Sequence, residues 1–207
     1  MKVILVNGSP HKEGCTYMGL REIEKALNAN GIDAEIFWIG NEPLRGCLGC
    51  GACAKLGHCV TSSDSVNEFT EKAKSADGFI FGTPVHYASA TGAITSFMDR
   101  AFYSGGAALR GKPAAAIASC RRGGASASFD QLNKYFTINC MPIVSSNYWN
   151  QIHGSKPEDV LQDEEGLQTM RILGHNMAWL LKCIEAGKAA GVSMPEPEAK
   201  IRTNFIR

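Results

Sequence analysis

Five short apolar runs, each followed by a stretch with helical periodicity, constrain the fold of this chain most strongly. The runs occupy residues 3–6, 34–39, 78–82, 114–118 and 141–144. Runs of this length that are apolar at most positions are typical of strands buried on both faces of a parallel sheet. The stretches between and after them predict helices over about 16–30, 64–75, 93–102, 129–137 and 165–187. The pattern predicts an α/β, doubly wound, five-stranded parallel sheet with helices on both faces.

Size and composition indicate one domain and limit its partners. The chain has 207 residues, 44% hydrophobic and 20% charged, which is enough for one sizeable core, and no repeat or linker indicates a second. The net charge of +1 does not favour nucleic acid or a membrane surface. The N-terminal apolar run is too short for a signal peptide, and no later run approaches the length of a membrane span. We therefore expect a cytoplasmic protein without nucleic-acid or membrane partners.

The turn after the first apolar run has the composition of an anion-binding loop. It reads Gly8-Ser9-Pro10-His11-Lys12-Glu13-Gly14-Cys15-Thr16 and leads into a predicted helix. A helix N-terminus with hydroxyl groups and glycines beside it offers the donors that a phosphate needs. The glycine spacing matches neither a Walker loop nor G-x-G-x-x-G, which disfavours nucleoside triphosphates and a standard dinucleotide site. The alternative is a strand-to-helix turn in which Thr16 caps the helix and no ligand binds.

Two later turns complete a pattern that resembles a known family. The turn after the third run contains Thr83-Pro84 and Tyr87 and is followed by Asp99-Arg100, and the turn after the fourth run ends in Gly123-Gly124. With Gly8-Ser9-Pro10, Gly14 and Thr16, these residues resemble the three loops of the flavodoxin-like, NAD(P)H-dependent FMN reductases. The resemblance covers about residues 1–150. Cys15 departs from the family pattern, which commonly has Asn there, and a thiol is a weak donor to a phosphate.

The resemblance implies a flavodoxin-like FMN-binding domain over residues 1–190 that oxidises NAD(P)H and reduces a small-molecule acceptor. The implied FMN contacts are Ser9, His11, Gly14, Cys15 and Thr16 in the first loop, Thr83, Pro84, Val85, His86, Tyr87 and Ser89 in the second, and Ser119, Arg121 and Gly123 in the third. No catalytic side chain is assigned, because hydride transfer to a flavin is the chemistry of the cofactor. Asp99 and Arg100 are expected to form a structural ion pair. The adjacent Arg121 and Arg122 either meet a cofactor phosphate or are simply solvated.

A second candidate site lies after the second apolar run, in a glycine- and cysteine-rich loop over residues 43–60. Cys47, Cys50, Cys53 and Cys59 form a C-x2-C-x2-C-x5-C pattern. Crowded thiolates in a reducing cytosol favour iron-sulfur or zinc ligation over a disulfide framework. The pattern resembles the compact motif of iron-sulfur flavoproteins, a branch of the same family, and this implies one [4Fe-4S] cluster. The alternatives are a structural zinc, with His58 as a substitute ligand, and thiols that are empty or linked in disulfides.

Both candidate sites follow strands of one predicted sheet, so we expect them at the same rim, where electrons could pass between them. Reduced FMN could pass two electrons to a quinone-like, azo or flavin acceptor, or single electrons through the cluster. Two other functions remain open. One is a non-enzymatic electron carrier of the flavodoxin type, and the other is a metal- or redox-sensing binding module.

The C-terminal tail, residues 191–207, is a candidate oligomerisation arm. Pro195 and Pro197 prevent it from extending the preceding helix, and its apolar Ile201, Phe205 and Ile206 need a surface to cover. In the family that the chain resembles, subunits pair so that one chain's cysteine loop faces another's flavin. We therefore expect a homodimer or homotetramer. The alternative is a tail that wraps its own domain.

Overall fold

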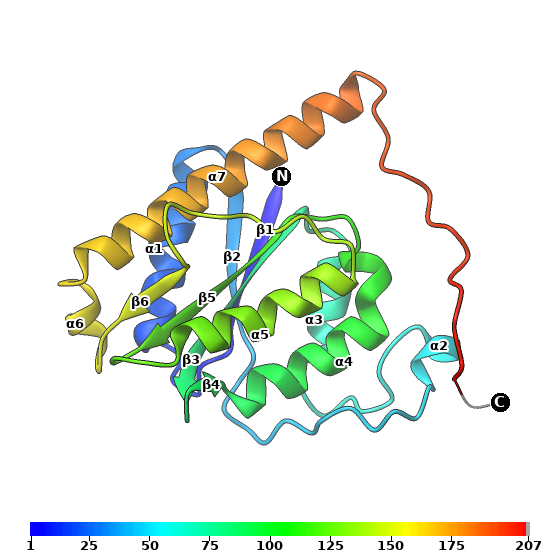
Figure 1. Cartoon of the computed structure of the whole chain (residues 1–207), viewed down its shortest axis with the longest axis horizontal. Coiled ribbons are helices and arrows are strands. Elements are labelled where there is room, and N and C mark those ends of the chain that lie inside the picture. Colours follow the sequence, from blue (N-terminus) through cyan, green and yellow to red (C-terminus); the bar gives the residue numbers. More distant parts are fainter. Residues whose placement is uncertain (206–207) are drawn as a thin grey trace.

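A computed structural model describes residues 1–205 and confirms the predicted doubly wound α/β architecture. The parallel strands lie in the order β2-β1-β3-β5-β6, namely β2 (Asp33–Trp38), β1 (Lys2–Asn7), β3 (Gly78–His86), β5 (Ala114–Cys120) and β6 (Gln151–His153). The two-residue β4 (Ser89–Ala90) pairs antiparallel with the end of β3. Helices cover both faces of this sheet (Figure 1). Residues 206–207, which include Ile206 of the predicted tail, lie outside the described residues.

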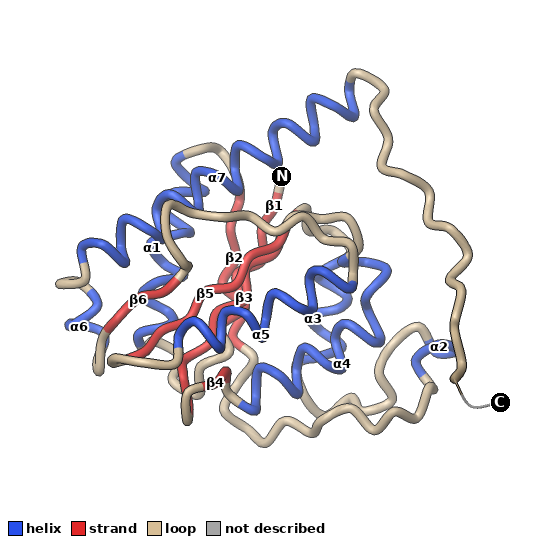
Figure 2. The backbone as a smooth tube through the Cα atoms, in the orientation of Figure 1, coloured by secondary structure: helices blue, strands red, loops and turns tan. Residues whose placement is uncertain are grey.

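The helices divide between the two faces. On one face pack α1 (Cys15–Ala29), the short α6 (Pro157–Val160) and the long α7 (Glu164–Ala189). On the other face pack α3 (Val66–Ala73), α4 (Gly92–Leu109) and α5 (Ala125–Ile138). The remaining helix, α2 (Cys53–Leu56), lies in a long loop away from the sheet, as Figure 2 shows. The fold therefore has three layers, with the cysteine-rich loop as an addition outside them.

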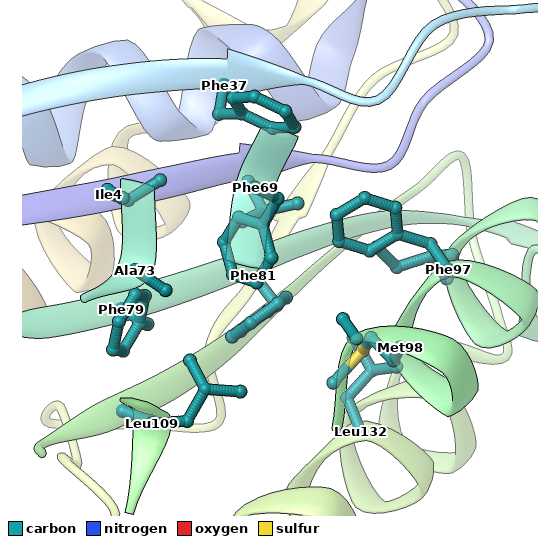
Figure 3. Close-up of a cluster of buried hydrophobic side chains, with 14 of the residues drawn as sticks. Ile4, Phe37, Phe69, Ala73, Phe79, Phe81, Phe97, Met98, Leu109 and Leu132 are labelled. Atoms are coloured by element: carbon teal, nitrogen blue, oxygen red, sulfur yellow. The ribbon is translucent and has the colours of Figure 1, made fainter. Parts of the chain in front are cut away.

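Successive side chains of the buried strands point to opposite faces of the sheet, so each strand contributes to both layers of the core. Ile4 and Val6 belong to the cluster under α3, α4 and α5, whereas Val3 and Leu5 belong to the cluster under α1 and α7. In the first cluster Phe69 of α3 is the centre of an aromatic group, with its ring 5.2 Å from Phe97, 5.7 Å from Phe37 and 5.8 Å from Phe81. Figure 3 shows these rings between the sheet and the helices. This packing fixes the ends of β1 and β3, where the first candidate site lies.

The predicted fifth strand at 141–144 is wrong. Ile143 makes only an isolated parallel bridge to Ala114, and Pro142 has no amide hydrogen with which to extend a ladder. The fifth parallel strand is β6, which pairs with β5 through Gln151, Ile152 and His153. It lies at the sheet edge and buries only Ile152 fully, so it needs no continuous apolar run. The sequence pattern therefore contained no signal for it.

The predicted helix over 93–102 is seven residues too short at its C-terminal end, because α4 continues through Gly105 and Gly106 to Leu109. A Cβ atom at Gly105 would lie 2.6 Å from the side chain of Thr70. Glycine is thus used here to let α3 and α4 pack closely. This extension matters for function, since the added turns of α4 form one wall of the cysteine-rich loop.

Along the described residues, no helix combines the length and the apolar character needed to cross a membrane. After Ala189 the chain leaves α7 and runs on without helix or strand to residue 205 (Figure 1). Ile201 and Phe205 in this tail are each 91% exposed. The tail therefore contributes little to the core of its own chain.

Candidate functional site

A cavity of about 890 Å³ opens at the carboxyl ends of the central strands. Its walls come from the first loop, the residues after β2, the end of β3, the end of β5 and the segment before α6. This is where parallel α/β sheets bind their ligands, because the loops after several strands converge there.

The first loop is held in place by hydrogen bonds from its own residues and its neighbours. The backbone amide of Ser9 donates to Asn7 Oδ1 at 3.0 Å, and the amide of His11 donates to Ser9 Oγ at 3.1 Å. Trp38 Nε1 donates to the carbonyl of Ser9 at 2.8 Å. A Cβ atom at Gly8 would lie 2.8 Å from the carbonyl oxygen of Gly82, so only glycine lets the loop approach β3 this closely. The loop is therefore preformed.

The start of α1 supplies the donors of an anion site. Its N-cap residue is Gly14, and among the described residues no side chain caps this helix end. The amides of the first helical turn have no intrahelical acceptor, and the helix dipole adds positive charge there. Lys12, Arg121 and Lys156 also line the cavity, against one carboxylate, Glu13. The charge balance and the uncapped amides fit the phosphate of FMN.

Two hydroxyl groups join the first loop to β5. Thr16 Oγ1 and Ser119 Oγ lie 2.7 Å apart, and both residues are almost fully buried. The ligand-free alternative required Thr16 to cap the helix. The Thr16 hydroxyl instead contacts β5.

Two thiols lie beside these hydroxyl groups. Burial raises the pKa of the Cys15 thiol, and the carboxylates of Asp159 and Glu158 add to this effect. Burial likewise raises the pKa of Cys120. These two thiols are thus weak acids that stay protonated near neutral pH.

The second and third loops pack against each other at the rim of this cavity. Tyr87 and Ala88 have positive φ angles of 47° and 61°, and form the tip of the β3–β4 hairpin, where His86 pairs with Ser89. A two-residue hairpin loop commonly needs positive φ at both central residues, and this one adopts it without the glycine or asparagine that usually supplies it. Gly124 has a φ of 91°, and a Cβ atom there would lie 2.6 Å from the Cα of Ala88. The glycine is required for the loops to meet.

The structure brings most of the predicted FMN contacts to one cavity. The predicted residues that line it are Ser9, His11, Gly14, Cys15, Thr16, Pro84, Val85, Ser119 and Arg121. Thr83 is buried below it, with its hydroxyl donating to the carbonyl of Pro84. His86 and Tyr87 lie on the exposed hairpin, Ser89 donates to Gln131 Oε1 at 2.8 Å, and Gly123 is exposed. These last residues surround the cavity and are outside its lining.

One whole wall of this cavity and the residues at the end of β2 were not predicted from the sequence. Gly154, Ser155, Lys156 and Pro157 form that wall, whereas Trp38 is the last residue of β2 and Asn41 follows it. This wall directly follows β6. Because the fifth strand was predicted at 141–144, the turn after residue 153 was not recognised as the end of a strand. Asp159 accepts hydrogen bonds from the amides of Ser155 and Lys156 at 3.0 and 3.2 Å and shapes this turn. A signal was available in Ser155-Lys156-Pro157 with Asp159, since proline in the first turn and an acidic residue soon after it are typical of a helix start.

A second cavity, of about 160 Å³, is lined by all four cysteines of the predicted motif. Cys47 and Cys50 are exposed, whereas Cys53 and Cys59 are half-buried. Gly49 and Gly51 have positive φ angles of 62° and 68°, which places the tight turns between the first three cysteines. The far wall is α4, through Arg100, Tyr103 and Ser104.

The thiols surround this cavity without meeting at one point. Each of the eight cysteines is a free thiol. The described residues contain no group of three or more His, Cys, Asp or Glu side chains placed to hold one metal ion. Two donors approach the sulfurs, since the amide of Gly49 lies 3.5 Å from Cys47 Sγ and Arg100 Nε lies 3.3 Å from Cys59 Sγ. The chemistry of this donor set, four thiols with N–H groups beside two of them, fits an iron-sulfur cluster, in which each cysteine would bind its own iron.

The expected ion pair between Asp99 and Arg100 is wrong, because successive helix residues point in different directions. Asp99 accepts a hydrogen bond from the hydroxyl of Tyr135 at 2.5 Å, and burial together with this carboxylate raises the pKa of Tyr135. Arg100 pairs instead with Asp64, which precedes α3. Burial opposes the charge of Arg100, but its hydrogen bonds to Asp64 and Cys59 raise its pKa, so it stays a cation.

The expectation of a shared rim is only partly right. The cysteine-rich loop leaves the rim beside Trp38 and Asn41, which line the first cavity. It then runs along α4 to α2, as Figure 1 shows, so the cysteines gather near the C-terminal half of that helix. Within residues 1–205 the two cavities share no lining residue. The two sites are therefore separate within one chain.

Comparisons with known proteins identify the family of this chain. The family model of NADPH-dependent FMN reductases matches residues 1–155. An iron-sulfur flavoprotein of Methanocaldococcus jannaschii is 35% identical over 193 residues, covering 89% of this chain and 100% of that protein. An iron-sulfur flavoprotein of Methanosarcina thermophila is 26% identical over 193 residues, covering 91% and 99%.

Solved structures show the same fold at low sequence identity. RosB with bound 8-demethyl-8-formylriboflavin-5'-phosphate superposes with a TM-score of 0.68 at 14% identity, covering 100% of this chain and 92% of that one. A flavodoxin from the Archaea superposes with a TM-score of 0.60 at 17% identity, covering 88% and 99%. The family match and the iron-sulfur flavoprotein relatives support a flavin-based redox function for this flavodoxin-like fold. The chain belongs to the NADPH-dependent FMN reductase family, in its iron-sulfur flavoprotein branch.

Proposed function

We propose that this protein oxidises NAD(P)H with a noncovalently bound FMN and passes the electrons to a small acceptor or through a [4Fe-4S] cluster. The observation that carries the proposal is the strand-end cavity, because the three loops that resemble those of FMN reductases converge on it. FMN, when bound, supplies the hydride acceptance from the nicotinamide. The chain supplies binding, orientation and access.

The residues divide these tasks by position. The amides at the start of α1, with Ser9 and Thr16, bind the phosphate, and Lys12 and Arg121 balance its charge. Pro84 and Val85 orient the isoalloxazine ring system beside β3. His86 and Tyr87 on the exposed hairpin lie where they can cover the outer face of the flavin or its hydride donor. Tyr87 is fully exposed in the free chain and so is available to a ligand.

Turnover separates this proposal from a non-enzymatic carrier. NADPH and NADH are added anaerobically in turn to the FMN-loaded protein, and the flavin absorbance is followed. We expect bleaching by at least one of them, and steady oxidation of that nicotinamide when a quinone or free flavin is supplied. A flavin that either nicotinamide leaves oxidised, but that dithionite reduces, would support the carrier instead.

The cysteine cavity is proposed to hold the cluster through Cys47, Cys50, Cys53 and Cys59. The cluster, when bound, supplies one-electron transfer. The thiolates bind iron, and the N–H groups of Gly49 and Arg100 stabilise charge on the sulfurs. Anaerobic reconstitution with iron and sulfide should give roughly four irons per chain. Zinc in the isolated protein that iron and sulfide do not displace would favour a structural metal.

We also propose a homodimer or homotetramer in which one chain's cysteine cavity faces another's flavin. The separation of the two cavities within a chain supports this, as do Trp149 and Trp179, which are 54% and 68% exposed. The exposed tail is a candidate arm between subunits. Sedimentation should show at least a dimer at micromolar concentration, and removal of residues 192–207 should weaken it. A parent protein that is monomeric with FMN bound would contradict the assembly and leave the FMN site unaffected.

A further inference from the structure

All three nitrogens of the Arg100 guanidinium group donate hydrogen bonds, although the sequence near Arg100 in α4 does not indicate their acceptors. Its side chain is 2% exposed. Nε donates to Cys59 Sγ at 3.3 Å, Nη1 to the carbonyl of Arg45 at 3.3 Å, and Nη2 to the carbonyl of Thr61 at 2.8 Å. Both terminal nitrogens also bind the carboxylate of Asp64, with Nη2 3.1 Å from Oδ1. One buried side chain thus contacts four residues of another segment.

These four contacts lie at the two ends of the cysteine-rich loop. Arg45 stands two residues before Cys47, and Cys59, Thr61 and Asp64 follow the last turn of the motif. Between these ends, all of which the structure describes, the only regular structure is the four-residue α2. Without a sheet or a long helix to hold it, the loop depends on side-chain contacts for its shape. Arg100 is therefore the point where both ends of the loop attach to α4.

Cys59 is held on both sides. Its backbone amide donates to Asn67 Oδ1 at 2.9 Å, and its carbonyl accepts from Asn67 Nδ2 at 2.9 Å. Its sulfur meets Arg100 Nε. Two residues from different helices, Asn67 of α3 and Arg100 of α4, thus fix the position and the orientation of this one thiol.

We propose that Arg100 is a positioning residue for the cysteine cavity. Arg100 holds the two ends of the loop together and stabilises negative charge on the sulfur of Cys59. Only the stabilisation of charge on Cys59 rests on the proposed cluster, whereas the attachment of the loop does not. A buried cation and an N–H donor beside a cluster ligand favour the reduced state of the cluster, which is more negative. They therefore raise the reduction potential of the cluster. Asp64 orients the guanidinium group through its bonds to both terminal nitrogens.

The test uses the double variant Arg100→Gln/Asp64→Asn in the full-length protein. The paired change avoids leaving the carboxylate of Asp64, 11% exposed, without its partner. Arg45→Gln is the matched control, since it removes a positive charge from an exposed side chain near the same cavity. FMN binding by both variants reports that the domain is folded.

Three measurements follow. In the double variant we expect iron to be lost to a chelator roughly tenfold faster. We expect a lower midpoint potential of the cluster than in the parent and in Arg45→Gln, a change that a merely structural role would not produce. In the metal-free protein we expect faster hydrogen exchange over residues 43–64, with the strands unchanged.

The outcomes distinguish the two proposals. Unchanged iron release and potential in a double variant that binds FMN would overturn the role of Arg100 while leaving the cluster standing. If the parent binds no iron, the proposed cluster fails, and hydrogen exchange still decides whether Arg100 holds the loop. Unchanged exchange over residues 43–64 would then overturn that role too.

Discussion

The strand-end cavity and the cysteine cavity are built from one chain by different means. Most walls of the first are residues that directly follow buried strands, so the sheet and its core fix them. The second lies in a long loop with one four-residue helix, and its shape depends on contacts from Arg100 and Asn67. The fold therefore preforms the first cavity, whereas side-chain contacts assemble the second.

This difference has an energetic consequence. A ligand that binds a preformed site stabilises the whole domain, because it binds only the folded state. A cluster bound in a loop that has no sheet or long helix would use part of its binding free energy to order that loop. Changes at one site should therefore leave the other site intact.

The largest expected effect is the complete loss of one centre. Cys50→Ala removes one ligand of the proposed cluster, and a four-thiolate site reduced to three ligands should retain essentially no cluster after purification. FMN should remain, since Cys50 is outside the strand-end cavity. Iron analysis and the visible spectrum measure both. The matched control is Cys183→Ala, an exposed cysteine outside the motif, which should keep both cofactors.

The reverse experiment should weaken the flavin site and spare the cluster. Ser9→Asp places a carboxylate in the loop assigned to the FMN phosphate, at a position that is 3% exposed. Repulsion at short range in a partly desolvated site should weaken FMN binding roughly 10- to 100-fold. Ser9→Asn, similar in size but neutral, separates charge from shape and should bind FMN much better, as fluorescence titration would measure. If the aspartate variant binds FMN like the parent, the loop assignment is wrong.

A smaller effect is expected in the reactivity of the thiols. Cys120 is 7% exposed, and burial raises its pKa, so less thiolate is present at any pH near neutrality. In the metal-free protein, alkylation of Cys120 should be at least about tenfold slower than that of Cys47 or Cys50. Its rate should also keep rising with pH above 9.0, the usual pKa of a cysteine thiol, because burial raises the pKa of Cys120. Mass spectrometry of each cysteine measures this, and equal rates would show that the strand-end cavity is not the more rigid of the two.

The smallest effect concerns the sheet edge from which the cysteine-rich loop departs. Glu35 of β2 pairs with Lys2 and with Lys72, whose Nζ lies 2.7 Å from Oε1, and these partners lower its pKa. Because all three side chains are partly exposed, Glu35→Gln should cost about 0.5–1 kcal/mol of unfolding free energy at pH 7.

The pH dependence of this cost has a defined sign. A carboxyl group whose pKa is lowered in the folded state stabilises it above the usual pKa of 4.5, and this stability is lost as the pH falls through the lowered pKa. The difference between parent and variant should therefore disappear in acid. Urea unfolding at a series of pH values measures it, and a difference that persists at low pH would assign it to packing.

The same contrast explains what the sequence could predict. The strands β1, β3 and β5 are runs of buried residues, so their periodicity was clear, and the first loop followed from the end of β1. The four cysteines were found by their spacing and do line one cavity. Features that depend on residues adjacent in the sequence could therefore be predicted from it.

Features that depend on tertiary contacts were not readable. Arg100 and Asp64 lie 36 residues apart, and nothing local links them. Strand β6 has three residues and one fully buried side chain, so it carries no periodic signal, and the wall at 154–157 was missed with it. Pairing across a fold is set by packing, which a single sequence does not display.

The most direct test of two separate centres in one chain is the cofactor content of protein purified without oxygen. Its visible spectrum, with flavin and iron quantified per chain, needs no variant and no assumption about the electron acceptor. We expect flavin bands together with broad cluster absorption, at about one FMN and roughly four irons per chain. Flavin bands with no iron, even after anaerobic reconstitution, would contradict this expectation.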